Sequence, residues 1–166
     1  EVVALVGGNG AGKSTLIHTL AGAHPADGGQ ILINGQPVTI HNPRDARTYG
    51  VETIYQKLAL ADNIDAAGNI FLGRELKTRF GALDDSAMDS ATQKLMKRLN
   101  PRFKNLRTPV MSLSGGQRQS VAIARAVYFG AKVLILDEPT SALGVHQTAN
   151  VLATIDRVRK QGIGVV

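Results

Sequence analysis

Cysteine is absent from this chain of 166 residues, which excludes disulfide bonds and thiolate metal sites and fits a reducing compartment. No apolar run approaches the roughly 18 residues that are needed to cross a bilayer, and no signal-peptide pattern precedes the first apolar segment. Internal repeats and low-complexity tracts are also absent. Since 43% of the residues are hydrophobic, the chain has the composition of one globular domain with its own core.

Aromatic residues are scarce around the main concentration of positive charge. The net charge is +6, a sign that is compatible with nucleic acid or an anionic membrane surface as partner. Much of this charge comes from Lys94, Lys97, Arg98, Arg102, Lys104 and Arg107. Only Phe103 is interleaved with them, whereas a nucleic-acid groove needs several stacking side chains. We therefore predict a solvated helix face and no nucleic-acid partner.

Residues 7–14 fit the phosphate-loop pattern G-x-x-x-x-G-K-[ST] at every fixed position. The apolar run 2–6 predicts a buried strand before the loop, and residues 14–20 predict a helix after it. Small residues let successive N–H groups approach a polyphosphate, Lys13 adds a full positive charge, and the Ser14 hydroxyl is a ligand for Mg²⁺. An ordinary glycine-rich turn is the alternative, which the flanking elements disfavour. The predicted triphosphate site comprises Gly7, Gly8, Asn9, Gly10, Ala11, Gly12, Lys13, Ser14 and Thr15.

The middle of the chain changes from β to α character. Residues 30–40 predict a hairpin around an Asn34-Gly35 turn, Asn42-Pro43 predicts a helix start, and residues 51–56 predict a strand. From 57 to 112 the β signal disappears. Ala91, Leu95, Met96 and Leu99 recur there at helical spacing behind Asp85 or Ser86 as a cap. We interpret residues 57–112 as an inserted helical subdomain.

The last third of the chain alternates between helix and strand. The expected elements are a helix at 116–129, a strand at 133–136, a helix at 145–161 and a final strand at 162–166. Such alternation predicts an α/β fold with a mostly parallel sheet flanked by helices. Both ends of the chain lie in predicted core strands, so we expect residues 1–166 to be a single domain that is incomplete at both ends.

Two carboxylates follow the most apolar strand. Asp137 and Glu138 come directly after residues 133–136, at the strand end where ligands bind in open α/β sheets. Asp137 is a candidate Mg²⁺ ligand beside Ser14, and Glu138 a candidate base for the water that attacks the γ-phosphate. Gln56 ends another strand on the same side, where its amide oxygen can reach the metal or the water. Two exposed loop carboxylates are the alternative.

A serine and two glycines start the helix predicted at 116–129. Ser114, Gly115, Gly116 and Gln117 offer a hydroxyl and free N–H groups, which together form a second anion site. One chain carries only one triphosphate, so a second γ-phosphate contact makes sense only if two chains face each other. An ordinary serine-capped helix is the alternative.

Together these motifs resemble the nucleotide-binding domain of ABC (ATP-binding cassette) transporters, a P-loop NTPase fold. The motifs occur in the order that the family has. They are the phosphate loop, Gln56 as the Q-loop glutamine, LSGGQ at 113–117, LILDEP at 134–139 and a D-loop at 140–143. The resemblance implies ATP and Mg²⁺ as cofactors and ATP hydrolysis as the activity. It also implies a head-to-tail dimer that places each ATP between one phosphate loop and the opposite LSGGQ.

The family's partners follow from the same resemblance. It implies a peripheral subunit on the cytoplasmic face of the bacterial cell membrane, bound to transmembrane permease subunits and indirectly to a periplasmic sugar-binding protein. The helical subdomain and the region after Gln56 would receive a coupling helix of the permease. Residues 69–75 and 141–145 resemble ATPases of importers for simple sugars such as ribose, xylose or fructose.

Some features of the family are missing, and other functions stay open. The adenine-stacking aromatic residue and the γ-phosphate histidine would lie beyond the two ends, and Gly144 stands where many relatives carry an aspartate. The alternatives are an ABC-type ATPase that acts on nucleic acid or ribosomes, an importer ATPase for another small solute, and a regulatory module without hydrolysis. The insert at 57–112 is too short for a coiled coil, and Lys13, Asp137 and Glu138 are intact, which favours the importer.

Overall fold

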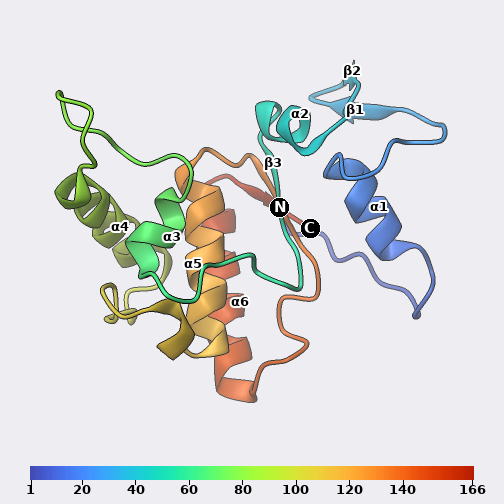
Figure 1. Ribbon diagram of the computed structural model, residues 1–166. Coiled ribbons are helices and arrows are strands. Elements are labelled where there is room, and N and C mark those ends of the chain that lie inside the picture. The colour runs from blue at the N-terminus through green and yellow to red at the C-terminus, as the bar shows by residue number, and fades with distance from the viewer.

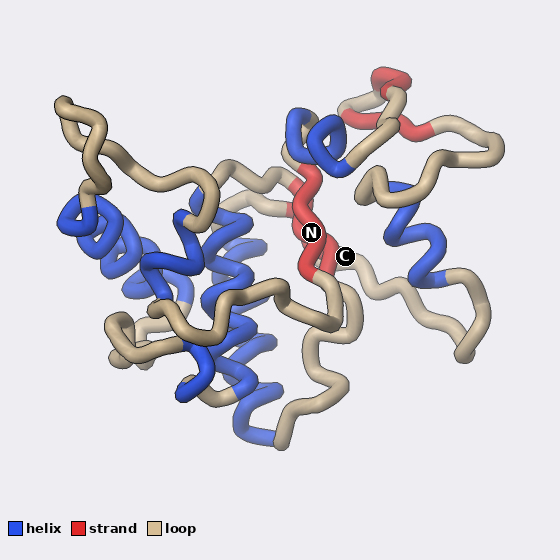
Figure 2. Tube along the Cα trace, in the orientation of Figure 1, coloured by secondary structure: helices blue, strands red, loops and turns tan.

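The computed structural model describes all residues from Glu1 to Val166 (Figures 1 and 2). Its helices and strands, with one short 3-10 helix (η1), alternate as the α/β prediction requires. In chain order they are α1 Lys13–Leu20, β1 Ile31–Ile33, β2 Gln36–Val38, α2 Pro43–Thr48, β3 Val51–Ile54, α3 Ala66–Phe71, α4 Asp85–Leu99, η1 Val110–Ser112, α5 Gly115–Tyr128, β4 Val133–Leu136, α6 Val145–Lys160 and β5 Gly164–Val165.

The strands form two separate sheets, as predicted. Strands β3, β4 and β5 make a parallel sheet in that order, with Ile54 opposite Leu136 at the carboxyl end. Strands β1 and β2 form the small antiparallel hairpin. Its turn depends on Asn34 (φ 52°) and Gly35 (φ 76°), a conformation that asparagine and glycine tolerate best. The mostly parallel core sheet and the small antiparallel part are therefore confirmed.

The buried strand predicted for residues 2–6 is wrong. Only Val2 forms a bridge, with Val165, and the Val3 N–H donates to the Val165 carbonyl at 2.8 Å. Because β5 is just two residues long, it offers no partner beyond this point, and Val6 is 83% exposed. The chain then leaves the sheet edge and reaches α1 on the far side of the strands from the large helices (Figure 1).

Several element boundaries also differ from the sequence prediction. Strand β3 ends at Ile54, so Gln56 lies in the following loop, and the final strand covers only Gly164–Val165. The cap of α4 is Asp84, whose carboxylate accepts a hydrogen bond from the Ala87 N–H, and neither Asp85 nor Ser86. The N-cap of α2 is Asn42 with Pro43 at the first position, as expected.

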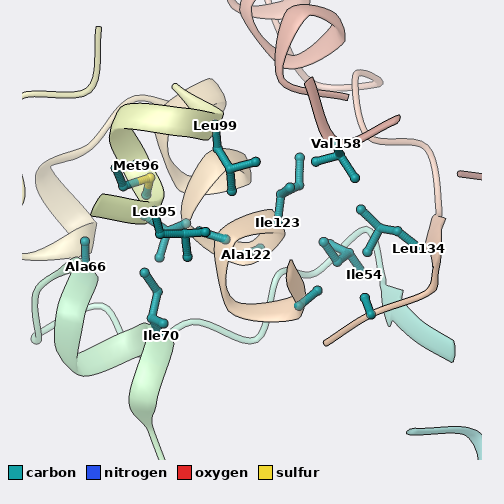
Figure 3. Packing of buried hydrophobic residues seen from close by; sticks show 14 of the residues in the cluster. Ile54, Ala66, Ile70, Leu95, Met96, Leu99, Ala122, Ile123, Leu134 and Val158 are labelled. Carbon is teal, nitrogen blue, oxygen red and sulfur yellow. The ribbon is translucent and has the colours of Figure 1, made fainter. Parts of the chain in front are cut away.

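The hydrophobic core lies between the parallel sheet and the helices that follow it. A cluster of 24 buried residues runs from Ile54 to Val165, with α5 at its centre. Ile123 of α5 faces Leu134 and Val158, while Ala66, Ile70, Leu95 and Met96 form the side that belongs to α3 and α4 (Figure 3). Residues 57–112 contain α3, α4 and η1 and contribute to this same core. None of the helices combines the length and apolar character that a membrane span requires.

Candidate functional site

The phosphate loop depends on glycine at two positions. Gly10 and Gly12 have φ angles of 79° and 86°, which side chains disfavour, and Gly12 is the N-cap of α1. No side chain caps this helix, so the first N–H groups of α1 remain available to a ligand. The Lys13 Nζ donates to the carbonyls of Gly7 at 2.8 Å and Gly8 at 2.9 Å. The ammonium group thus lies over the loop.

Glu138 lies next to the phosphate loop in the folded domain. Residues Asn9 to Thr15 and Glu138 line a hollow of about 310 Å³, which includes Ser14 but neither Gln56 nor any residue of 113–117. Glu138 has a φ of 48°, unusual for a residue with a side chain and costing about 1 kcal/mol or more. Its carbonyl accepts hydrogen bonds from the Ser141 N–H and hydroxyl, which hold this conformation. The turn after β4 therefore presents the carboxylate at the loop.

Asp137 lies at the carboxyl edge of the parallel sheet. Its N–H donates to the Ile54 carbonyl at 2.9 Å, which places Asp137 beside the end of β3, next to Tyr55 in the following loop. The pKa of Tyr55 is raised, mainly because burial disfavours the phenolate and further because the Asp137 carboxylate is near; Arg47 opposes this. Tyr55 also meets the His18 ring of α1 edge-on, with centroids 5.4 Å apart. This contact ties the phosphate-loop helix to the sheet.

The oxygen donors of the site suit magnesium. No group of three or more His, Cys, Asp or Glu side chains is arranged to hold a metal ion. Mg²⁺, however, is held in phosphate sites by one or two protein oxygens together with the phosphates and water. The Ser14 hydroxyl and the Asp137 carboxylate are oxygen donors of this kind, so these residue types fit the ion, although Asp137 does not line the hollow that contains Ser14.

Gln56 lies with Glu138 in a second cavity. This cavity, of about 320 Å³, is also lined by Gly115, Arg118 and Ser141. Glu138 thus borders both the phosphate-loop hollow and the cavity that contains Gln56. The structure brings Gln56 to the candidate base, but not to the hollow that contains Ser14.

The residues predicted as a second anion site form a capping box. The Ser114 hydroxyl accepts from the Gln117 N–H at 3.3 Å, and the Gln117 side chain accepts from the Ser114 N–H at 2.9 Å. Ser114 nevertheless remains exposed at the start of α5, and the N–H groups of Gly115 and Gly116 are not used by this box. The capped-helix alternative and an anion site are therefore compatible.

Sequence reasoning missed the packing role of both glycines. A Cβ atom on Gly115 would lie 2.6 Å from Leu143, and one on Gly116 would lie 3.3 Å from Gln147. These glycines let the start of α5 approach the start of α6. The glycine pair itself is visible in the sequence, but Leu143 and Gln147, against which it packs, are distant in the chain.

A polar groove between β3, α3 and α5 was also missed. It has a volume of about 210 Å³ and contains Arg47, Glu52, Arg74 and Arg125. The Arg47 guanidinium lies 3.6 Å from the Glu52 carboxylate, and burial lowers the pKa of Arg125. No periodic pattern marks these residues because they come from three separate segments.

Comparison with known proteins shows the family of the chain. The family model described as "ABC transporter" matches residues 1–141. The chain belongs to the ABC transporter family. Two solved ABC structures match at TM-scores of 0.79 and 0.78. One is an ATP-binding cassette in its ADP conformation, which shares the fold at 23% identity over 95% of this chain and 65% of that one. The other, from Clostridium perfringens, is described as part of an ABC transporter complex and is 27% identical over 99% of this chain and 65% of its own.

Several curated proteins named as import ATP-binding proteins are more similar in sequence. This chain is 46% identical to the xylose/arabinose import ATP-binding protein of Sulfolobus acidocaldarius and 43% identical to the fructose import ATP-binding protein of Rhizobium meliloti. It is 45% identical to a ribose import ATP-binding protein of Streptomyces avermitilis. Each match covers all of this chain, which spans 66% of the first two relatives and 33% of the third.

Proposed function

We propose that this domain binds ATP on its phosphate loop and hydrolyses it, with Glu138 as the general base. The observation that carries the proposal is the hollow shared by residues 9–15 and Glu138. It holds the parts that phosphoryl transfer needs, namely backbone N–H donors, a lysine ammonium and a carboxylate beside the phosphates. The family membership supports the same reaction.

Each residue of the site has a separate task. The free N–H groups at the start of α1 and the Lys13 ammonium bind the phosphates and offset their charge. The Ser14 hydroxyl and the Asp137 carboxylate would hold Mg²⁺, which supplies further neutralisation of the transferred phosphoryl group. The Glu138 carboxylate accepts a proton from the attacking water. Gln56 shares a cavity with Glu138 and orients that water.

The complete site needs a second copy of the chain. Residues 113–117 do not line the hollow of their own phosphate loop, although Ser114 is exposed at the tip of α5. Two chains arranged head to tail place Ser114, Gly115, Gly116 and Gln117 of one copy against the triphosphate of the other. The unpaired N–H groups of that helix start suit a γ-phosphate.

A permease is the proposed membrane partner, with the domain peripheral on the cytoplasmic face. The polar groove that contains Arg47, Glu52, Arg74 and Arg125 lies beside the segment after Gln56 and fits the coupling helix of such a subunit. A helix end with acidic or carbonyl groups would pair with the arginines of this groove.

The proposed cargo is a monosaccharide. Relatives at 43–46% identity are named for the import of xylose, arabinose, fructose and ribose. A sugar-binding protein outside the membrane would deliver the cargo to the permease. This domain itself would contact neither the sugar nor the sugar-binding protein. Nothing in the site is shaped for the sugar itself; specificity belongs to the partners.

Glu138→Gln tests the proposed reaction. The substitution keeps the shape of the side chain and removes the base, so we expect ATP binding to persist while turnover falls about 100-fold or more. Asp156→Asn is the control, because it removes a carboxylate on α6 that lines neither cavity containing Glu138, and it should leave turnover near the wild-type value. Hydrolysis at the wild-type rate by Glu138→Gln would show that Glu138 is not the base.

A further inference from the structure

A hairpin between α3 and α4 protrudes from the body of the domain (Figure 1). Its two arms meet at the antiparallel bridge between Lys77 and Leu83. Inside this bridge the Thr78 N–H donates to the Ala82 carbonyl at 2.8 Å, and the Gly81 N–H donates to the Thr78 carbonyl at 3.0 Å. Gly81 has a φ of 84°, which allows the tight turn. The hairpin is therefore a defined structure that ends in a fixed tip.

The tip presents an aromatic side chain to solvent. Phe80 is 92% exposed, the highest fraction among the exposed large hydrophobic residues, and Leu83 is 56% exposed. Full exposure of a phenylalanine is unfavourable in water, and nothing in the fold of this domain requires it. An exposed aromatic residue on a convex tip therefore indicates contact with something outside the domain.

Positive charge accompanies Phe80 on the tip. Lys77 and Arg79 are both exposed, and the Arg79 guanidinium lies 6.0 Å from the centroid of the Phe80 ring. No acidic residue occurs between 77 and 83. The flanking acids are engaged at the base, where Glu75 accepts from the Gly73 N–H at 2.8 Å and Asp84 caps α4. Asp85, in the first turn of α4, is the nearest acid without such a contact.

The shape of the tip favours a lipid surface over a folded protein. A specific protein interface buries roughly 800 Å² on each partner, with complementary shape, which seven residues on a convex hairpin do not supply. A bilayer surface needs no such complementarity. Aromatic rings lie favourably at headgroup level, and each nearby lysine or arginine adds attraction to anionic lipids.

The hairpin also continues from the groove assigned to the permease. Leu72 and Arg74 line that groove, and the chain passes from them directly into the hairpin. We propose that the tip at residues 77–83 rests on anionic lipid headgroups beside the permease, an inference that relies on the proposed membrane-bound function for its location. Phe80 enters the headgroup layer, while Lys77 and Arg79 pair with the lipid phosphates.

The test uses the absence of tryptophan from the chain. The variant F80W carries a single indole fluorophore at the tip. Its emission should shift to the blue with vesicles made of equal parts phosphatidylglycerol and phosphatidylethanolamine, and the shift should be lost at high salt. Vesicles of phosphatidylcholine alone should cause no shift, because they carry no net negative charge.

Charge and apolar contact are then removed separately. On the F80W background, replacing Lys77 and Arg79 by alanine should weaken vesicle binding about fivefold per charge. The same loss of charge through Lys94→Ala and Lys97→Ala should change binding less than twofold. In sedimentation with the anionic vesicles, Phe80→Ser should lower the bound fraction, whereas Leu152→Ser, at an exposed position on α6, should not.

Three results would overturn the proposal: no blue shift with anionic vesicles, an equal shift with phosphatidylcholine, or a shift that appears only with detergent-solubilised permease. The last result would assign the tip to a protein contact. ATP binding by F80W is measured in parallel. Vesicle binding without ATP binding would contradict the proposed function alone, and ATP binding without vesicle binding would contradict the hairpin proposal alone.

Discussion

The phosphate-loop region, residues 1–42, and the helical region, residues 57–161, are built in different ways. In the phosphate-loop region the buried hydrophobic residues are Ile17, Ala21 and Ile40, and the loop itself is exposed. In contrast, none of the 24 residues of the core cluster precedes Ile54. The loop is shaped by glycine conformations and by hydrogen bonds from Lys13. The anion site is therefore formed mainly by backbone groups of the phosphate loop, while the hydrophobic core is formed by residues from Ile54 onward.

The difference has a consequence for local stability. Segments with few buried contacts open at low free-energy cost, and a ligand that binds them contributes stability by mass action. The phosphate-loop region should therefore be the part of the chain whose order depends most on nucleotide. The helical region should keep its structure with or without it.

The largest expected effect comes from the helical region. Phe71 is fully buried and packs edge-on against Tyr128 and Phe129, with centroids 4.6 and 6.1 Å away. Phe71→Ala should lower the free energy of unfolding by about 3–5 kcal/mol, measured by urea denaturation. Leu16→Ala in the phosphate-loop region, where Leu16 is 47% exposed, should cost about 1 kcal/mol or less. An equal loss of unfolding free energy at the two positions would contradict the difference in packing between the phosphate-loop region and the helical region.

A smaller effect is expected from a glycine. The Cβ atom that Gly115→Ala introduces would meet the end of the Leu143 side chain at 2.6 Å, so Leu143 must move. We expect a loss of about 1–3 kcal/mol. Gly8→Ala, where a Cβ meets nothing within 4 Å, should leave the urea midpoint unchanged. If Gly115→Ala is as stable as the parent, the contact between the starts of α5 and α6 is looser than described.

The smallest effect is expected at Val6. Because Val6 is 83% exposed, Val6→Ser should change the free energy of unfolding by no more than about 0.5 kcal/mol. The same substitution at Val121, which is fully buried in α5, provides the contrast. A cost above about 1 kcal/mol for Val6→Ser would mean that residues 2–6 are buried in solution, as the apolar run suggested.

Much of the fold follows from local pattern. Strand β4 occupies the predicted residues 133–136, and α5 begins and ends one residue before its predicted bounds. These elements are long or strongly apolar, and their neighbours bury them on the expected faces. The hairpin turn at Asn34-Gly35 was equally predictable, because the residue types themselves favour positive φ.

The remaining differences depend on contacts between distant segments. An apolar run such as 2–6 becomes a strand only if partner strands extend along it, and β5 provides two residues. Asp84, Asp85 and Ser86 can all cap a helix, but the Asp84 N–H is fixed by the Leu76 carbonyl in the preceding hairpin, which selects Asp84. The candidate site shows the same limit. Its residue types were visible, whereas the shared border of Glu138 with two cavities was not.

The composite site is tested most directly by mixing two inactive variants. Lys13→Ala disables the phosphate loop, and Ser114→Arg blocks the exposed start of α5. In a head-to-tail pair of one Lys13→Ala chain and one Ser114→Arg chain, one site carries both defects and the other carries none. We therefore predict negligible ATP hydrolysis by either variant alone and a clear recovery when they are mixed. No recovery on mixing, with both variants folded, would contradict a site shared between two chains.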